Sequence, residues 1–157
     1  MSKARWLDET EAAAWRGLWA MSHLVFDRLG RELQRHSGLS IAEYDILVRL
    51  DTAEDGRIRM SALAEQTLAP RARLSYQIKG MQAAGLVDRE ECTTDRRGAF
   101  AVLTAAGREA LRDTAPAHVQ DVHTYLIEAL TREQLEQLGT IADAVEAHLD
   151  AFDQEHA

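Results

Sequence analysis

The segment from Leu86 to Gly107 constrains the fold of this chain more than any other. Residues 86–90 are apolar and then alternate in polarity, and residues 99–103 are apolar and compatible with a strand. Between these runs lie the charged and turn-forming residues Asp95, Arg96, Arg97 and Gly98. Two short apolar runs joined by such residues are typical of a β-hairpin. The sequence therefore predicts a hairpin with an arginine-rich tip.

Two short helices are expected directly before the hairpin. The first covers about residues 61–67. The second begins at Pro70, because the N–H that proline lacks would be unpaired in the first helical turn anyway. It ends near Gly85, since glycine readily adopts the left-handed backbone that stops a helix. Two short helices joined by a tight turn form a helix-turn-helix, whose second helix can enter a major groove of DNA. With the hairpin behind it, this unit is expected to be a winged helix.

Amphipathic helices are expected before this unit. Residues 9–36 carry one apolar stripe at steps of three or four, and Gly38 follows as a stop signal. Ser40 and Glu43 have the spacing of a capping box, which opens a second helix through about Thr52. The following turn could include a short strand that pairs with the hairpin.

Helices are also expected after the hairpin. Thr104 is an N-cap candidate for a long helix, which Pro116 should kink or split. Thr131 and Gln134 form another capping box and open a last amphipathic helix. Long apolar stripes at both ends of the chain imply that these helices pack on each other, across the two-fold axis of a homodimer. Bundling within one chain is the alternative.

The net charge of -8 argues against DNA binding until its distribution is considered. Residues 56–112 hold 10 basic and 6 acidic side chains, a net charge of +4, whereas residues 113–157 hold 1 basic and 10 acidic, a net charge of -9. DNA binding depends on local neutralisation of phosphates. We therefore expect the central part to face DNA and the acidic third to face away. Solvated helix faces with chance asymmetry are the alternative.

Several functional classes find no support in the sequence. No apolar run approaches the roughly 20 residues of a membrane helix, and the first ten residues lack the apolar core of a signal peptide, which predicts a cytoplasmic protein. The single cysteine, Cys92, excludes an internal disulfide. The histidines are too scattered to predict a metal site. Without a phosphate loop, a nucleophile elbow or a Cys–His pair, neither enzyme activity nor a cofactor is expected.

The predicted order of helix, helix, helix-turn-helix, wing, helix and helix resembles the multiple-antibiotic-resistance-regulator (MarR) family of bacterial transcription factors. The stretches that carry the resemblance are Asp95-Arg96-Arg97-Gly98, Leu103-Thr104-Ala-Ala-Gly107, Met60-Ser-Ala-Leu-Ala-Glu65 and Lys79 to Leu86. The resemblance covers nearly the whole chain. One departure is Ala69, where the family usually has a serine-type cap before its recognition helix.

The resemblance implies a mainly α fold with a small β-hairpin wing. Residues 1–157 would form a single domain, in which 8–37 and 105–153 are dimerisation helices and 40–104 are the winged helix-turn-helix lobe that binds DNA. The implied function is a ligand-responsive repressor that binds a pseudo-palindromic operator as a homodimer. A winged-helix module that binds another protein, without direct DNA contact, is the alternative from a different functional class.

The resemblance also implies which side chains contact DNA. In the family, an aspartate holds the wing arginine by an ion pair and the arginine enters the minor groove. Carried over, Asp95 orients Arg97, beside Arg96. On the expected recognition helix, four side chains lie towards the front or flanks, where they can contact bases or phosphates. These are Arg71, Arg73, Tyr76 and Lys79.

An effector pocket is implied where the dimer arms meet the winged helix. The candidate residues are Trp15, Trp19, His23 and Tyr44, which could bind a small aromatic or anionic ligand. Trp15 and Trp19 are one helical turn apart and therefore share one face. Ordinary packing of the arms is the alternative, because tryptophan is common in cores and interfaces.

Overall fold

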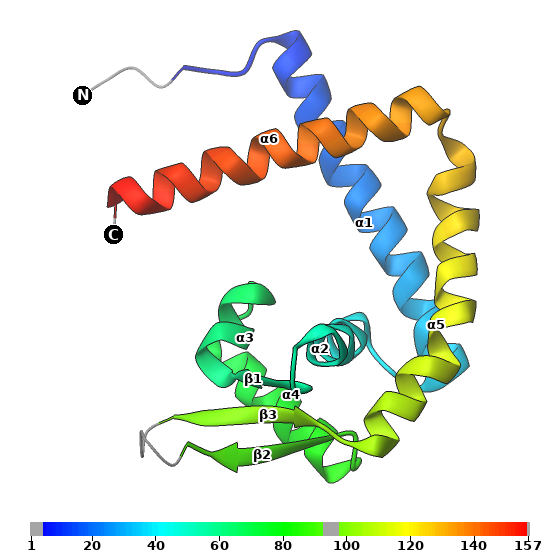
Figure 1. The fold of residues 1–157 in the computed structure, drawn as a ribbon. Coiled ribbons are helices and arrows are strands. Elements are labelled where there is room, and N and C mark those ends of the chain that lie inside the picture. The colour runs from blue at the N-terminus through cyan, green and yellow to red at the C-terminus, as the bar shows by residue number, and fades with distance from the viewer. Residues whose placement is uncertain (1–4, 93–97, 157) are drawn as a thin grey trace. The chain divides into compact units, whose positions relative to one another are not determined.

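The computed structural model describes residues 5–92 and 98–156, whose helices and strands are drawn in Figure 1. In chain order they are α1 (Glu9–Ser37), α2 (Ile41–Thr52), β1 (Arg57–Arg59), α3 (Met60–Gln66), α4 (Arg71–Ala83), β2 (Val87–Glu91), β3 (Ala99–Leu103), α5 (Ala105–Tyr125), the 3-10 helix η1 (Ile127–Ala129) and α6 (Arg132–His156). This mainly helical fold with a small sheet confirms the predicted class. The chain divides into two compact units, Met1–Val119 and Gln120–Ala157.

Capping signals mark the starts of α2 and α6 and the ends of α1 and α4, whereas α4 begins at Arg71, one residue after the expected start, with Pro70 as its N-cap. The Ser40 hydroxyl accepts a hydrogen bond from the Glu43 N–H at 3.3 Å, and the Glu43 carboxylate accepts one from the Ser40 N–H at 2.8 Å. Gly38 and Gly85 follow α1 and α4 with φ of 74° each, the left-handed conformation that suits glycine. In the second unit, the amide oxygen of Gln134 accepts from the Thr131 N–H at 2.9 Å, as the second capping box predicts.

The three strands form an antiparallel sheet in the order β1-β3-β2. Val87 pairs with Leu103 and Glu91 with Ala99, which confirms the predicted hairpin. Arg59 of β1 pairs with Phe100, so the short strand before α3 extends the hairpin into a sheet. Figure 1 shows α2, α3 and α4 grouped around these strands.

The core of the first unit lies between the helices and one face of the sheet. Leu74, Ile78 and Met81 of α4 are each 1% exposed, so one side of this helix is fixed against the core. The opposite side of α4 therefore faces solvent. The largest fully buried side chains are Leu33, Ile46, Leu47, Leu50, Leu63, Leu74, Ile78, Met81 and Val87.

The sequence predicts that Pro116 either kinks or splits the helix after the hairpin, and of these two outcomes the split is wrong. Helix α5 continues without a break through Pro116 and ends at Tyr125. A proline inside a helix removes one N–H and crowds the carbonyl four residues earlier, but a continuous helix can accommodate both effects by bending, and Pro116 itself is exposed. The break comes at Leu126, with φ -132° and ψ -57°, directly before η1.

The start of α5 is tied to the turn between α4 and β2. The Thr104 hydroxyl donates to the Gly85 carbonyl at 2.7 Å and accepts from the Gly107 N–H at 2.9 Å. A Cβ atom at Gly107 would lie 2.0 Å from the Leu86 carbonyl oxygen and 2.9 Å from Leu103 Cδ1. Only glycine allows the two backbones to approach this closely.

We therefore expect Gly107→Ala to lower the free energy of unfolding by about 3 kcal/mol, because the backbone at Leu86 cannot yield as a flexible side chain could. Urea denaturation followed by circular dichroism measures this change. Gly80→Ala in α4 is the control, since a Cβ at Gly80 meets no atom within 4 Å. It should raise stability by about 0.5–1 kcal/mol. Equal stability of the two variants would contradict the close approach.

Candidate nucleic-acid interface

Helix α4 presents a basic face to solvent. Its sequence from Arg71 to Ala83 contains no acidic residue, and Arg71, Arg73 and Lys79 are exposed. Tyr76 is 80% exposed, an unusual position for a large aromatic side chain. The structure therefore brings all four side chains predicted on this helix to its solvent side.

The cations of α4 are not neutralised within the described residues. No carboxylate of residues 5–92 or 98–156 forms an ion pair with Arg71, Arg73 or Lys79. By contrast, Arg49 of α2 pairs with Asp45 at 2.8 Å. Guanidinium and ammonium groups without such partners remain available to anionic oxygens.

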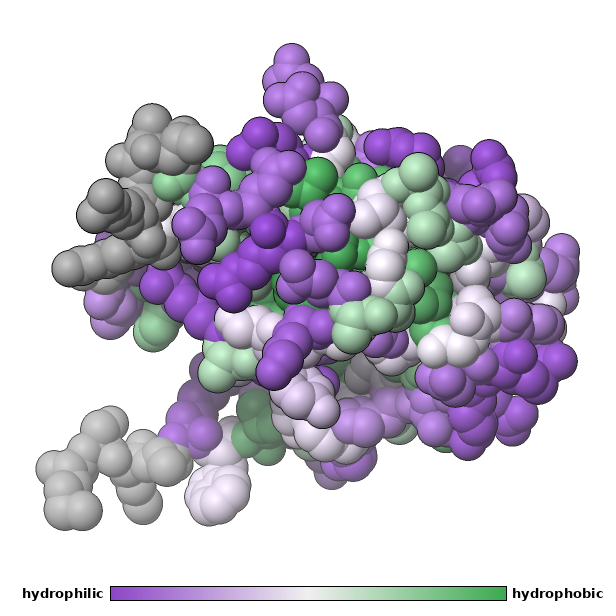
Figure 2. Space-filling model, turned by 90° about the horizontal axis from the view of Figure 1, so that it is seen from below, coloured by the Kyte–Doolittle hydropathy of each residue, from purple (hydrophilic) through white to green (hydrophobic). Residues whose placement is uncertain are grey.

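Two cavities flank α4 on the side of the hairpin. One, of about 290 Å³, is lined by Arg59 and Arg71, and the other, of about 470 Å³, by Tyr76, Lys79 and Arg89. Strands β1 and β2 thus add arginines beside the cations of the helix. Figure 2 views the molecule from below Figure 1, and hydrophilic residues cover most of this face.

The base of the hairpin holds its arginines in defined positions. The Arg59 Nη2 donates a hydrogen bond to Cys92 Sγ at 3.1 Å. The guanidinium carbon of Arg57 lies 4.1 Å from the centroid of the Phe100 ring, and its Nη1 lies 3.6 Å from a Glu90 carboxylate oxygen. The predicted tip residues Asp95, Arg96 and Arg97 lie outside the described part of the chain, so their roles stay predictions.

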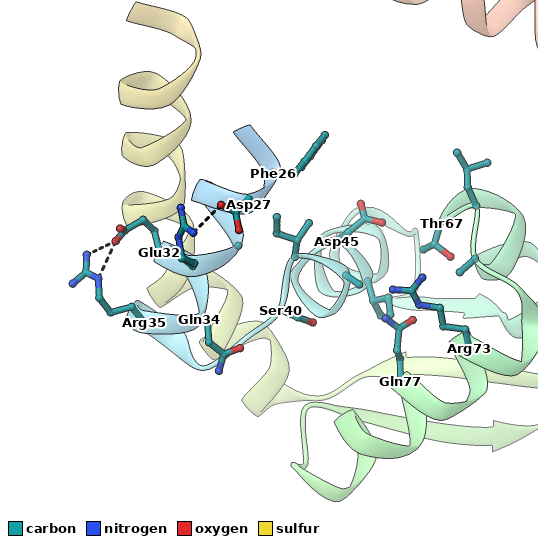
Figure 3. Close-up of a pocket in the computed structure, with 17 residues that line it drawn as sticks. Phe26, Asp27, Glu32, Gln34, Arg35, Ser40, Asp45, Thr67, Arg73 and Gln77 are labelled. Carbon is teal, nitrogen blue, oxygen red and sulfur yellow. Dashed lines mark hydrogen bonds and ion pairs between the residues drawn. The ribbon is translucent and has the colours of Figure 1, made fainter. Parts of the chain in front are cut away.

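A wide groove of about 1280 Å³ lies between α1, α2 and the start of α4 (Figure 3). Arg73 and Gln77 project from α4 towards α2 in this groove. Leu68, in the turn between α3 and α4, also lines it and is 92% exposed with φ of 50°. The Arg73 side chain can therefore bind either a ligand in this groove or a ligand on the solvent side of α4.

The four predicted effector residues separate into two groups. Trp15, Trp19 and His23 form a ladder on α1, with ring centroids 5.8 Å apart for the first pair and 4.2 Å for the second. Tyr44 instead packs on His118 at 4.5 Å, and burial raises the pKa of its phenol. Effector binding by these residues stays a prediction, with helix packing by the tryptophans as the alternative.

Comparison with known proteins identifies the fold. A model of the MarR family matches residues 37–98. AbsC, a MarR family transcriptional regulator from Streptomyces coelicolor, is 42% identical, with a TM-score of 0.86 over 94% of this chain and 99% of AbsC. The chain belongs to the MarR family. Its winged helix is therefore that of a family of transcriptional regulators.

Two further MarR-type proteins are similar to this chain. Sco3205, a MarR family regulator from Streptomyces coelicolor solved in complex with DNA, is 39% identical, with a TM-score of 0.89 over 95% of this chain and 93% of Sco3205. YetL, an HTH-type transcriptional repressor of Bacillus subtilis (strain 168), is 29% identical over 85 residues, which are 54% of this chain and 51% of YetL. The chain thus spans about half the length of YetL.

This MarR fold places basic residues at the interface that the sequence analysis did not single out. Arg59 and Arg89 join the surface only because β1 and β2 lie beside α4. Ser75 lines both cavities. The sequence does contain a signal for Ser75, because Arg71, Ser75 and Lys79 are spaced by four residues and therefore share one face of a helix. Across the described residues, no helix has the length and apolar character needed to cross a membrane.

Proposed function

We propose that this MarR family protein is a repressor that binds a pseudo-palindromic DNA operator as a homodimer. Residues 40–104 form the DNA-binding lobe, and 8–37 with 105–153 form the dimerisation helices. The observation that carries the proposal is helix α4, whose cations have no carboxylate partner among the described residues, in a protein with a net charge of -8. Because α4 has exposed cations and no acidic residue, it gives this acidic protein a basic surface that can bind an anionic partner.

The relatives support the same function. Sco3205 was solved in complex with DNA, and YetL is a repressor. The alternative, a winged helix that binds only another protein, is not favoured. Dispersal of Arg71, Arg73, Lys79, Arg96 and Arg97 over the surface would support it. The three of these on α4 are all exposed, and Arg96 and Arg97 lie outside the described residues.

Each interface residue has a role suited to its chemistry. Helix α4 enters the major groove, where arginine can bind guanine O6 and N7 and the Tyr76 ring can pack against a thymine methyl. Lys79 contacts a phosphate. At the hairpin tip, Arg97 enters the minor groove, held by Asp95 and accompanied by Arg96. Narrow minor grooves attract arginine because their potential is strongly negative.

We expect Tyr76→Ala to weaken operator binding about fivefold or more, because a base contact contributes about 1–3 kcal/mol. The folded protein should keep its thermal stability, since Tyr76 is 80% exposed. Fluorescence anisotropy with labelled operator and with random DNA measures the effect, and binding to random DNA should change little. Arg112→Ala in α5 is the control, because Arg112 pairs with Glu109 and Asp113 and should not contact DNA. An unchanged operator affinity in Tyr76→Ala would contradict the proposal.

The dimer is supported by apolar side chains that each unit leaves exposed. Helix α6 has no buried residue, and Ile141, Val145, Leu149 and Phe152 are 60%, 52%, 55% and 51% exposed. Their spacing of three or four residues puts them on one stripe of the helix. An apolar stripe of this length is typical of a helix that packs against a partner.

Leu149→Glu should therefore shift the protein from dimer to monomer, because a carboxylate would be buried at the interface without a partner. Sedimentation velocity at micromolar concentration measures the change. Operator affinity should fall with dimerisation, since one lobe contacts only half of the site. Glu146→Gln on the same helix is the control and should remain dimeric. A monomeric unmodified protein, or a dimeric Leu149→Glu, would contradict the assignment of α6 to the interface.

A further inference from the structure

The geometry of DNA places a requirement on the surface between α4 and the hairpin. A major groove and its neighbouring minor groove are separated by one sugar-phosphate backbone. A protein that inserts a helix into the first and a hairpin into the second must therefore cross that backbone. This step rests on the proposed function, and it predicts phosphate contacts from residues that lie between the two elements.

A cavity of about 290 Å³ lies at this place, between the start of α3, α4 and the base of the hairpin. It is lined by Arg59, Met60, Ser61, Arg71 and Ser75, together with Gly98 and Ala99 where β3 begins. None of the described residues that line it is acidic. The two guanidinium groups supply positive charge and N–H donors, and each hydroxyl can donate a further hydrogen bond to a phosphate oxygen.

We propose that this cavity binds one phosphate of the DNA backbone in each half of the operator. Arg59 and Arg71 approach the phosphate from the strand and the helix, and the Ser61 and Ser75 hydroxyls donate to its remaining oxygens. The ligand is a DNA phosphodiester and not free phosphate, because the cavity is bounded by the two elements that enter adjacent grooves. Arg59 thereby sets the register of helix and hairpin on the duplex, a role that phosphate contacts commonly have.

The sheet positions Arg59 for this role. Its pairing partner in β3 is Phe100, whose ring centroid lies 5.6 Å from the Arg59 guanidinium carbon. Its hydrogen bond to Cys92 Sγ holds the guanidinium at the hairpin base. A long side chain that is already restrained loses less conformational entropy when it binds.

Arg57 is the natural comparison for Arg59. The two arginines are two residues apart on β1 and therefore extend from the same face of the sheet. Arg57, however, is not among the residues that line the cavity. Neutralising Arg57 removes the same charge from the same strand without touching the proposed phosphate site.

The first test compares Arg59→Gln and Arg57→Gln in binding to operator DNA between about 50 and about 200 mM salt. Each lost phosphate contact lowers the slope of log affinity against log salt by about 0.9, so Arg59→Gln should flatten the slope by roughly 2 per dimer. The affinity ratio between wild type and variant should then change about tenfold across the range. Arg57→Gln should keep the wild-type slope. Ser75→Ala should also weaken binding. Because Ser75 is exposed on a helix, this variant should fold, and it tests the inference if Arg59→Gln does not fold.

The second test neutralises single operator phosphates as methylphosphonates and scans them one by one. Wild type should lose affinity at one particular phosphate per half-site, and Arg59→Gln should show no further loss there. Equal losses for both proteins at every position would overturn the inference and leave the proposed function standing. A wild-type protein that binds no DNA at low salt would overturn both. A wild-type slope in Arg59→Gln would overturn the inference alone.

Discussion

The placement of the DNA-binding surface depends on the contact between Thr104, Gly107 and the turn that ends α4. At this junction the recognition helix stops at Gly85, both hairpin strands have an end, and α5 begins. The Thr104 hydroxyl links the Gly85 carbonyl to the first turn of α5, and the missing side chain of Gly107 lets that turn lie against the Leu86 carbonyl. Helix and hairpin therefore have a fixed spacing, which they need if they are to enter adjacent grooves.

Basic and acidic side chains are concentrated in different parts of the sequence. Helix α4 and the strands beside it have arginines and a lysine that face solvent, whereas the last 45 residues are strongly acidic. Because DNA binding depends on local neutralisation of phosphates, the basic residues of α4 and the neighbouring strands can bind DNA although the whole chain is acidic.

Local signals in the sequence predicted most of the fold. The Ser40–Glu43 capping box, the stop at Gly85 and the apolar residues 99–103 each depend on neighbours in sequence, and each is confirmed. At Pro116 the sequence allowed a kink or a split, and the split is wrong because the hydrogen bonds on either side of the proline keep α5 continuous.

Contacts between residues far apart in the sequence could not be predicted from local signals. Tyr44 packs on His118 and not beside the tryptophans of α1, because the fold brings α2 and α5 together. Arg59 and Arg71 line one cavity although they are separated by α3 and a turn. The pairing of β1 with β3 and the position of this sheet beside α4 bring the two side chains together.

The central claim is that helix and hairpin bind adjacent grooves of one duplex, and dimethyl sulfate footprinting tests it most directly. This reagent methylates guanine N7 in the major groove and adenine N3 in the minor groove. On DNA that the protein selects from a random pool, the account predicts protected guanines in two segments about one helical turn apart, with protected adenines in the minor grooves that flank them. Enrichment of no sequence, or protection confined to one kind of groove, would contradict it.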